Sequence, residues 1–229
     1  MNTPSLTFSI VVAFSKNERG IGYKGTIPWS VPEDMKFFRT LTKQRKNGEP
    51  NKPNVLIMGK NTSRSLPNGG SPLPDRINIC VSSTLPETIP LPHLDFFTNG
   101  SSSSINEFIC INSFSKVLRY LETQQNNIGN IFVIGGEQLY KVAIHYPQCH
   151  KIYVNVISFP FRKKIPPFNT GNEDHPPIFD TFFPEINPEE YELVEETPLY
   201  PFGEQRNRVV SRFYMRIISQ RVDTNNLYV

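Results

Sequence analysis

The sequence predicts an α/β fold with a mostly parallel central sheet, flanked by helices and closed by an antiparallel strand pair at the C-terminal end. Three observations support this prediction. Short apolar runs recur along the chain, segments with helical periodicity separate them, and the last two runs alternate polar and apolar residues. Strands that alternate with helices are typical of parallel sheets.

The first expected strand covers residues 10–14, which are apolar on both faces, as in a central strand covered on both sides. The first expected helix begins near Pro32, with acidic residues in its first turn, and extends to about Thr42. The later elements are expected in this order: strands 54–58, 77–81 and 108–111, a helix at 113–121, a strand at 131–134, a helix that follows Gly135-Gly136 and runs through Leu139 to about His145, a strand at 152–157, and the closing strands 191–194 and 212–218.

Length and composition are those of one globular domain. The chain has 229 residues, of which 38% are hydrophobic and 20% are charged. We predict a single domain over residues 1–229, with a core at about 8–218. Two stretches near 83–107 and 158–177 hold much of the proline and are expected to be surface loop excursions.

Net charge, the length of the apolar runs and the cysteine content argue against several classes of partner and site. A net charge of +3 is too small to indicate nucleic-acid binding, and no apolar run is long enough to span a membrane. No secretory signal is visible at the N-terminus. The three scattered cysteines favour neither a disulfide framework nor a metal site. We therefore expect a cytoplasmic protein without a metal that acts on a small molecule, and a monomer unless it is part of a larger fusion.

The segment 20–29 has the spacing of a dinucleotide-binding fingerprint, because Gly20, Gly22 and Gly25 follow a predicted strand as G-x-G-x-x-G. A true fingerprint opens a helix directly from its last glycine, whereas Pro28 here disfavours helical geometry. We interpret the segment as a loop that crosses a site, with its glycines giving mobility.

The apolar residues Ile21, Ile27 and Trp29 of this loop would be unexplained in a plain surface turn, and they are suited to cover a ligand. Asp34 follows in the first turn of the expected helix and faces back toward the strand and the loop. A lone carboxylate beside such a loop is a candidate for managing a proton.

Five separated segments, in this order and spacing, resemble the eukaryotic type of dihydrofolate reductase, and the match extends from about Phe8 to Ile218. The resemblance implies reduction of 7,8-dihydrofolate to 5,6,7,8-tetrahydrofolate by hydride transfer from NADPH, which supplies one-carbon metabolism. It also implies antifolate inhibitors as ligands. The segments are Val12-Ala13 with residues 20–29 and Asp34, then residues 57–62, 72–78, 133–140 and 180–186.

The resemblance implies a substrate site centred on Asp34, whose buried carboxylate would accept two hydrogen bonds from the pterin ring. Burial should raise the pKa of this group. Arg76 would pair with the α-carboxylate of the glutamate tail. The implied catalytic residues are Asp34, Trp29 and Ile27, and the implied substrate-binding residues are Val11, Val12, Asp34, Met35, Phe38, Leu73, Arg76, Ile134, Tyr140 and Asn155.

The resemblance also implies an NADPH site, in which Lys60 and nearby backbone N–H groups would hold the pyrophosphate. The implied cofactor-binding residues are Ala13, Ile21, Gly25, Gly59, Lys60, Asn61, Thr62, Ser82, Ser83, Gly135, Gly136, Glu137, Gln138 and Leu139.

The chain departs from the family pattern at several positions. Ser63 replaces a tryptophan, and Asn155 stands where the family usually has a threonine bonded to the catalytic acid. Ser83 and Asn112 replace two arginines expected near the adenosine 2′-phosphate, and Lys60 and Lys116 are candidates to compensate. We therefore expect a weaker preference for NADPH over NADH than is usual in the family.

Two alternatives remain open at this stage. One is a paralogue with the same fold, such as a pyrimidine reductase of riboflavin synthesis, against which Asp34, Phe38 and Arg76 argue. The other is a homologue that binds folate without turnover, which the missing tryptophan and arginines would allow. Methotrexate binding without turnover would distinguish this second alternative.

Overall fold

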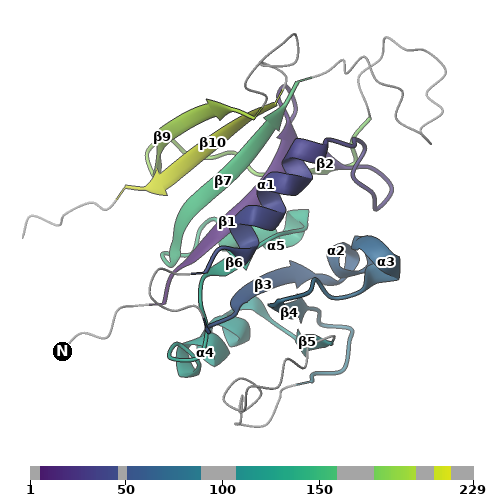
Figure 1. The fold of residues 1–229 in the computed structure, drawn as a ribbon, viewed down its shortest axis with the longest axis vertical. Helices are drawn as coiled ribbons and strands as arrows, with labels where there is room; N and C mark the ends of the chain where they lie inside the picture. The colour runs from purple at the N-terminus through teal and green to yellow at the C-terminus, as the bar shows by residue number, and fades with distance from the viewer. Residues whose placement is uncertain (1–5, 46–50, 89–106, 159–177, 200–208, 218–229) are drawn as a thin grey trace, which may run out of the picture.

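The computed structural model describes residues 6–45, 51–88, 107–158, 178–199 and 209–217. The predicted loop excursions fall largely outside these ranges, as do the predicted end of the last strand at Ile218 and the C-terminal tail. Figure 1 shows the described part as a twisted sheet with helices beside it. None of the helices in these ranges combines the length and the apolar character that crossing a bilayer requires.

Eight strands of the described ranges form the central sheet: β1 (Phe8–Ser15), β3 (Asn54–Gly59), β4 (Arg76–Val81), β5 (Phe108–Ile111), β6 (Ile131–Val133), β7 (Cys149–Ile157), β9 (Tyr191–Pro198) and β10 (Val209–Arg216). Their spatial order is β5-β4-β3-β6-β1-β7-β10-β9. The strands from β5 to β7 are parallel, and β10 is antiparallel to both β7 and β9. The predicted fold class is confirmed.

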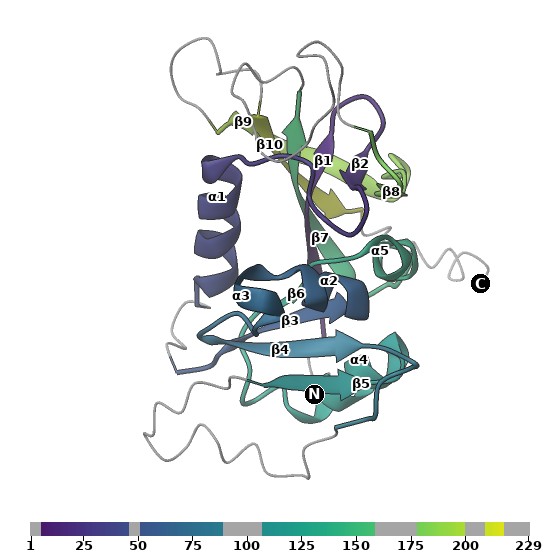
Figure 2. The same cartoon turned by 90° about the vertical axis from the view of Figure 1, so that its right-hand side faces the viewer.

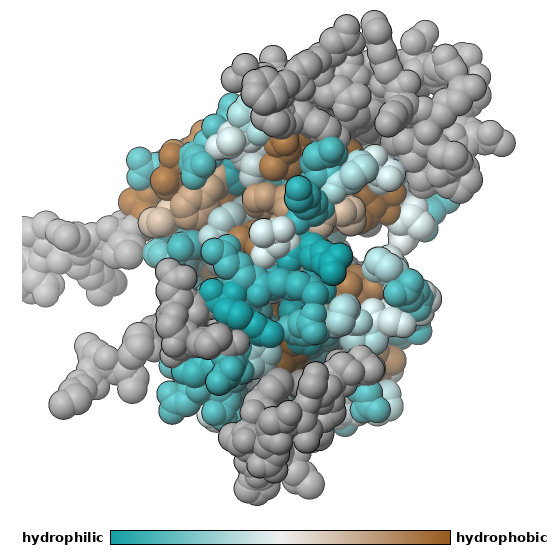
Figure 3. Space-filling view, in the orientation of Figure 1, coloured by the Kyte–Doolittle hydropathy of each residue, from teal (hydrophilic) through white to brown (hydrophobic). Residues whose placement is uncertain are grey.

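Helices cover both faces of the sheet (Figure 2): α1 (Pro32–Lys43) lies on one face, and α4 (Phe114–Thr123) and α5 (Glu137–Ala143) lie on the other. The outward face of α1 is mostly hydrophilic (Figure 3). Proline in the first turn and two acidic residues after it start α1, as the sequence predicts. Ser113 caps α4 by accepting a hydrogen bond from the backbone N–H of Lys116.

Periodicity in the sequence did not give the bounds of four short elements, because none of them is long enough to show it. They are the helices α2 (Lys60–Ser65) and α3 (Pro67–Gly70) and the strands β2 (Gly20–Gly22) and β8 (Thr181–Phe182), which pair with each other. The segment 20–29, called the glycine loop below, contains β2. The antiparallel β2–β8 pair joins this loop to a segment about 160 residues later in the chain.

The strand β1 packs on both faces, as its continuous apolar run predicts. Ile10 and Phe14 point into the larger core beneath α4 and α5. Val11 points the other way, into a smaller cluster that includes Leu56 and Met58 and is covered by α1. Burial of an aliphatic side chain contributes about 1.5–3 kcal/mol. These two cores therefore fix β1 at the centre of the sheet, beside the start of α1.

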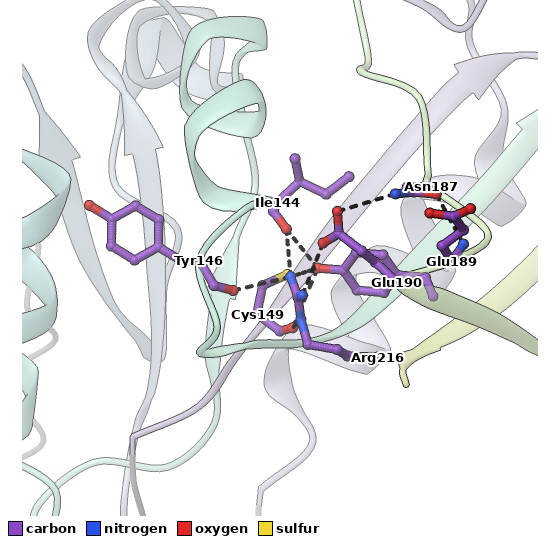
Figure 4. A network of polar contacts seen from close by, with 8 residues as sticks. Ile144, Tyr146, Cys149, Asn187, Glu189, Glu190 and Arg216 are labelled. Carbon is purple, nitrogen blue, oxygen red and sulfur yellow. Dashed lines mark hydrogen bonds and ion pairs between the residues drawn. The ribbon is translucent and has the colours of Figure 1, made fainter. Parts of the chain in front are cut away.

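Arg216 at the end of β10 holds the C-terminal strand against the chain that follows α5 (Figure 4). Its guanidinium group donates to the carbonyl oxygens of Ile144 at 2.8 Å, Tyr146 at 3.2 Å and Cys149 at 2.8 Å, and it pairs with Glu190 at 3.0 Å. Carbonyl groups at a helix end need such partners. The start of α5 lines a large cavity, so these bonds at the end of α5 help to position the wall of that cavity.

Candidate active site

A large cavity opens at the carboxyl ends of the parallel strands, where ligands bind in open α/β sheets. Its volume is about 1280 Å³. Residues of β1, α1, the glycine loop, α2, and the start of α5 line it. A cavity of this size whose exposed lining is mostly apolar is typical of a small-molecule site.

The structure brings nearly all of the predicted site residues together on this wall. The catalytic and substrate-binding candidates that line the cavity are Val11, Val12, Ile27, Trp29, Asp34, Met35, Phe38, Leu73, Arg76, Ile134, Tyr140 and Asn155. The cofactor-binding candidates that line it are Ala13, Ile21, Gly25, Gly59, Lys60, Asn61, Thr62, Gly135, Gly136, Glu137, Gln138 and Leu139.

Ser82 and Ser83 were predicted to bind the cofactor, and the structure does not place them on the cavity wall. The backbone N–H of Ser82 bonds to the carbonyl of Ile111, and its hydroxyl group contacts the hydroxyl group of Thr84 at 3.2 Å. These bonds turn the side chain toward its own loop. Val81, one residue earlier, lines the cavity instead.

Asp34 is the buried acid of the site, with 4% of its surface exposed. The amide nitrogen of Asn155 donates to its Oδ1 at 2.6 Å. Desolvation by burial raises the pKa of Asp34, while hydrogen bonds from Asn155 and Trp29 oppose that rise. The contact between Asn155 and Asp34 matches the predicted replacement for the family's threonine. Asn155 pairs with Ala13 in the sheet, so β7 sets its position.

Burial of Asp34 has an expected consequence for stability. Because the pKa of Asp34 is raised in the folded state, folding favours the protonated carboxyl group. The stability that this preferential protonation contributes is fully present below the unfolded-state pKa. It is lost as the pH rises through the folded-state pKa. Asp34→Asn should therefore be more stable than the wild type at pH 7, and this advantage should shrink toward pH 3. Urea denaturation at both pH values measures the difference, and a less stable variant at pH 7 would contradict it.

Tyr140 connects α5 to β1 beneath the cavity. Its buried hydroxyl group donates to the carbonyl oxygen of Val11 at 2.8 Å, and its ring packs edge-on against Phe183 at 4.9 Å between centroids. Burial raises the pKa of Tyr140 far above its usual value, so the hydroxyl group stays protonated and remains a donor.

We expect Tyr140→Phe to lower the free energy of unfolding by about 1–3 kcal/mol, because the carbonyl of Val11 loses its side-chain donor in a buried position. Chemical denaturation of the two proteins measures this change. Tyr120→Phe is the matched control, since Tyr120 is a tyrosine on α4 that does not line the cavity. An unchanged stability in Tyr140→Phe would show that this hydrogen bond contributes little.

Arg76 lies at the start of β4 and is 5% exposed. Its Nη1 donates to the hydroxyl group of Thr42 at 2.8 Å, and its Nε donates to the carbonyl of Pro74 at 3.0 Å. Burial lowers the pKa of Arg76 to about 10, which leaves the group charged at neutral pH. A guanidinium group has five N–H donors, so these two bonds leave others to meet a carboxylate in the cavity.

The backbone at Gly135-Gly136 approaches α2 closely and contains a cis peptide bond. The N–H of Gly59 donates to the carbonyl of Gly135 at 2.7 Å. A Cβ atom on Gly136 would lie 3.1 Å from the hydroxyl oxygen of Thr62, so a larger residue would crowd this contact. Neither α2 nor α5 has a side-chain cap at its start. The beginnings of both helices therefore share the cavity wall, with backbone polar groups near a ligand.

The glycine loop differs in part from its prediction. A Cβ atom on Gly20 would lie 2.1 Å from the ring of Phe179, and one on Gly22 would lie 2.6 Å from the hydroxyl oxygen of Thr181. Close packing is therefore a sufficient reason for these two glycines, and the mobility predicted for the loop stays a prediction. Gly25 has a φ of +76° and open space around it, as a turn glycine should.

Several lining residues were missed by the sequence reasoning. Phe37, Arg39 and Lys43 extend the α1 face of the wall, and Ser113 and Ser115 bring the start of α4 to it. The signal for α1 was available, since these residues lie within three turns of Asp34 on the same helix. No local signal identifies the α4 residues, because only the sheet order brings them to this edge.

Comparisons with known proteins agree with this geometry. The family model described as dihydrofolate reductase matches residues 7–216. The chain is 31% identical over 215 residues to a dihydrofolate reductase of Drosophila melanogaster, which covers 94% of this chain and 98% of the relative. It is 31% identical over 222 residues to a viral dihydrofolate reductase of Saimiriine herpesvirus 2, covering 96% and 87% respectively.

A solved structure has the same fold. It is a dihydrofolate reductase from Enterococcus faecalis complexed with NADP(H) and RAB-propyl, with a TM-score of 0.62 and 23% sequence identity. The similarity covers 93% of this chain and 97% of that one. A family match over nearly the whole chain, together with relatives of similar length, shows that this chain belongs to the dihydrofolate reductase family.

Proposed function

We propose that this chain reduces 7,8-dihydrofolate to 5,6,7,8-tetrahydrofolate with NADPH, and that Asp34 holds the pterin ring. The buried carboxylate of Asp34 carries the proposal. It is the acidic side chain at the α1 end of an otherwise largely apolar cavity, within the part of the chain that the structure describes. A carboxylate can accept two hydrogen bonds from the edge of a pterin and fix the plane of the ring.

Apolar groups complete the substrate end of the cavity. Phe38 follows Asp34 by one helical turn on the same face of α1, where its ring can pack on a flat heterocycle. Ile27, which is half exposed, and the buried Trp29 lie on the loop side. Together these side chains exclude water from the ring and would strengthen its hydrogen bonds to Asp34. The guanidinium group of Arg76 also lines the cavity and can bind the carboxylate of a glutamate tail.

The cofactor fits the remaining half of the cavity. Gly135-Gly136 presents backbone without side chains, and Lys60 places a positive charge at the start of α2. NADPH, when bound, supplies the hydride, and the protein needs to hold the nicotinamide beside the pterin. We propose that the raised pKa of Asp34 keeps a proton available near the ring at a higher pH than an exposed aspartate would.

The experiment that tests the proposal follows nicotinamide absorbance with purified protein, NADPH and dihydrofolate. We expect absorbance to fall only when both ligands are present and methotrexate to stop the reaction. Binding of methotrexate by a protein without turnover would contradict the proposed activity and favour a folate-binding role. Size-exclusion chromatography with light scattering in the same preparation tests the expectation of a monomer, and fractionation of source cells tests the proposed cytoplasmic location.

A further inference from the structure

The cavity extends well beyond Asp34. Its far end is lined by Val81 at the end of β4 and by Ser113 and Ser115 at the start of α4. Figure 1 shows β4, β5 and α4 at the end of the sheet opposite β9 and β10. A dinucleotide whose nicotinamide lies beside Asp34 must extend along α2 toward this far end. We refer to it below as the adenosine end, an assignment that rests on the proposed function.

Glu87 does not line the cavity, but its contacts place it beside the adenosine end. Its Oε1 accepts a hydrogen bond from the backbone N–H of Asn112 at 3.0 Å and contacts the ammonium group of Lys116 at 3.2 Å. Asn112 directly precedes Ser113, the cap of α4 and a residue of the cavity wall. The bonds of neighbouring Thr88 to Cys110, through its N–H at 2.9 Å and its hydroxyl group at 2.8 Å, hold this segment on β5.

These contacts matter because a ribose 2′-phosphate needs the same partners. A phosphate is stabilised by backbone N–H groups and by cationic side chains, whereas a 2′-hydroxyl group can donate a hydrogen bond to a nearby carboxylate. The carboxylate of Glu87 already uses the N–H of Asn112 and neutralises Lys116. The ammonium group of Lys60 instead bonds to the hydroxyl group of Thr84 at 2.7 Å, and no acidic side chain of the described residues forms an ion pair with it.

We propose that Glu87 is a specificity-determining residue that weakens the preference of this chain for NADPH over NADH, by occupying Asn112 and Lys116 at the adenosine end. Its negative charge opposes a 2′-phosphate and leaves Lys60 as the main cation facing it. NADH lacks the 2′-phosphate, so the negative charge of Glu87 does not weaken its binding in this way. The absence of the two arginines that the family usually has is then one cause of the weaker preference for NADPH. The negative charge of Glu87 is the other cause.

Binding measurements on the full chain test this assignment without relying on turnover. Trp29 is the single tryptophan of the sequence and lies in the cavity wall, so quenching of its fluorescence reports binding of either dinucleotide. We expect Glu87→Gln to tighten NADPH binding about tenfold and to change NADH binding less than about twofold, because only the phosphate gains the freed lysine. The ratio of the two Kd values should rise accordingly.

Two further variants make the result specific. Glu122→Gln removes the same charge from an exposed position near the other end of α4, and it should leave the ratio unchanged. Glu87→Gln combined with Lys116→Met should lose the gain in NADPH affinity, because the freed ammonium group is absent.

The outcomes distinguish an error in the role of Glu87 from an error in the proposed function. If both dinucleotides bind the wild type and Glu87→Gln leaves their Kd ratio unchanged, the role of Glu87 is wrong while the proposed function stands. Equal tightening of both dinucleotides would also contradict it, since the effect would then not depend on the phosphate. If neither dinucleotide quenches Trp29 in the wild type, the proposed function and the role of Glu87 are both contradicted.

Discussion

Asp34→Asn is expected to lower kcat/KM for dihydrofolate by roughly 100- to 10,000-fold, the range typical for loss of an essential proton-transfer group. Asparagine keeps the size of the side chain and a polar contact to Asn155, but it can neither carry the negative charge nor take up a proton. Binding of NADPH should change little, because none of the cofactor-binding candidates lies on α1.

The measurement is steady-state turnover followed by nicotinamide absorbance, together with the NADPH Kd from Trp29 quenching. Glu33→Gln is the matched control, since Glu33 is the adjacent acid in the same helical turn and does not line the cavity. A near-normal rate in Asp34→Asn would refute the assigned role. Because this variant should fold at least as stably as the wild type at pH 7, loss of activity could not be attributed to unfolding.

Arg76→Leu is expected to weaken binding of dihydrofolate and methotrexate by about 2–4 kcal/mol, or roughly 30- to 1,000-fold, through loss of a buried charge-assisted pair. A trimethoprim-like ligand has no glutamate tail, so its affinity should fall much less. The informative quantity is the difference in affinity loss between ligands with and without a glutamate tail. General damage to the cavity would weaken both classes and so would not contribute to this difference.

Arg76 also has structural bonds, to Thr42 and Pro74, and the experiment must separate them from ligand binding. Thr42→Val removes the hydroxyl partner and keeps the guanidinium group, so it should cost stability without the tail-specific loss of affinity. Titration of each protein with methotrexate and with the tailless ligand gives the comparison. An equal loss for both ligands in Arg76→Leu would show that Arg76 acts on the fold and not on the tail.

The sequence by itself determined the elements with strong periodicity and supplied candidates for the site that the structure brings to one cavity. Continuous apolar runs of β1, β3 and β4 and the amphipathic pattern of α4 are local signals, and they were read correctly. Asp34, Arg76 and Gly135-Gly136 were identified as candidates because each lies in one of five segments whose order and spacing together resemble a known family. The order and spacing of segments along the chain can be seen in the sequence without knowledge of the fold.

Only the tertiary structure decided the contacts between distant segments. The hydrogen bond from Asn155 to Asp34 joins residues 121 positions apart, and it depends on β7 lying beside β1. The pairing of β2 with β8 explains Gly20 by the ring that packs on it. The contact of Glu87 with Asn112 and Lys116 depends on a loop that returns to β5.

The physical reason is the same in each case. Sheet order and register are set by the total burial of apolar faces across the molecule, and no local pattern encodes which strand lies next to which. A side chain such as that of Ser82 can match a motif and still turn away, because a neighbouring hydroxyl group offers it a better hydrogen bond. The sequence thus determined which groups are present in the site, and the fold decided which of them face the cavity.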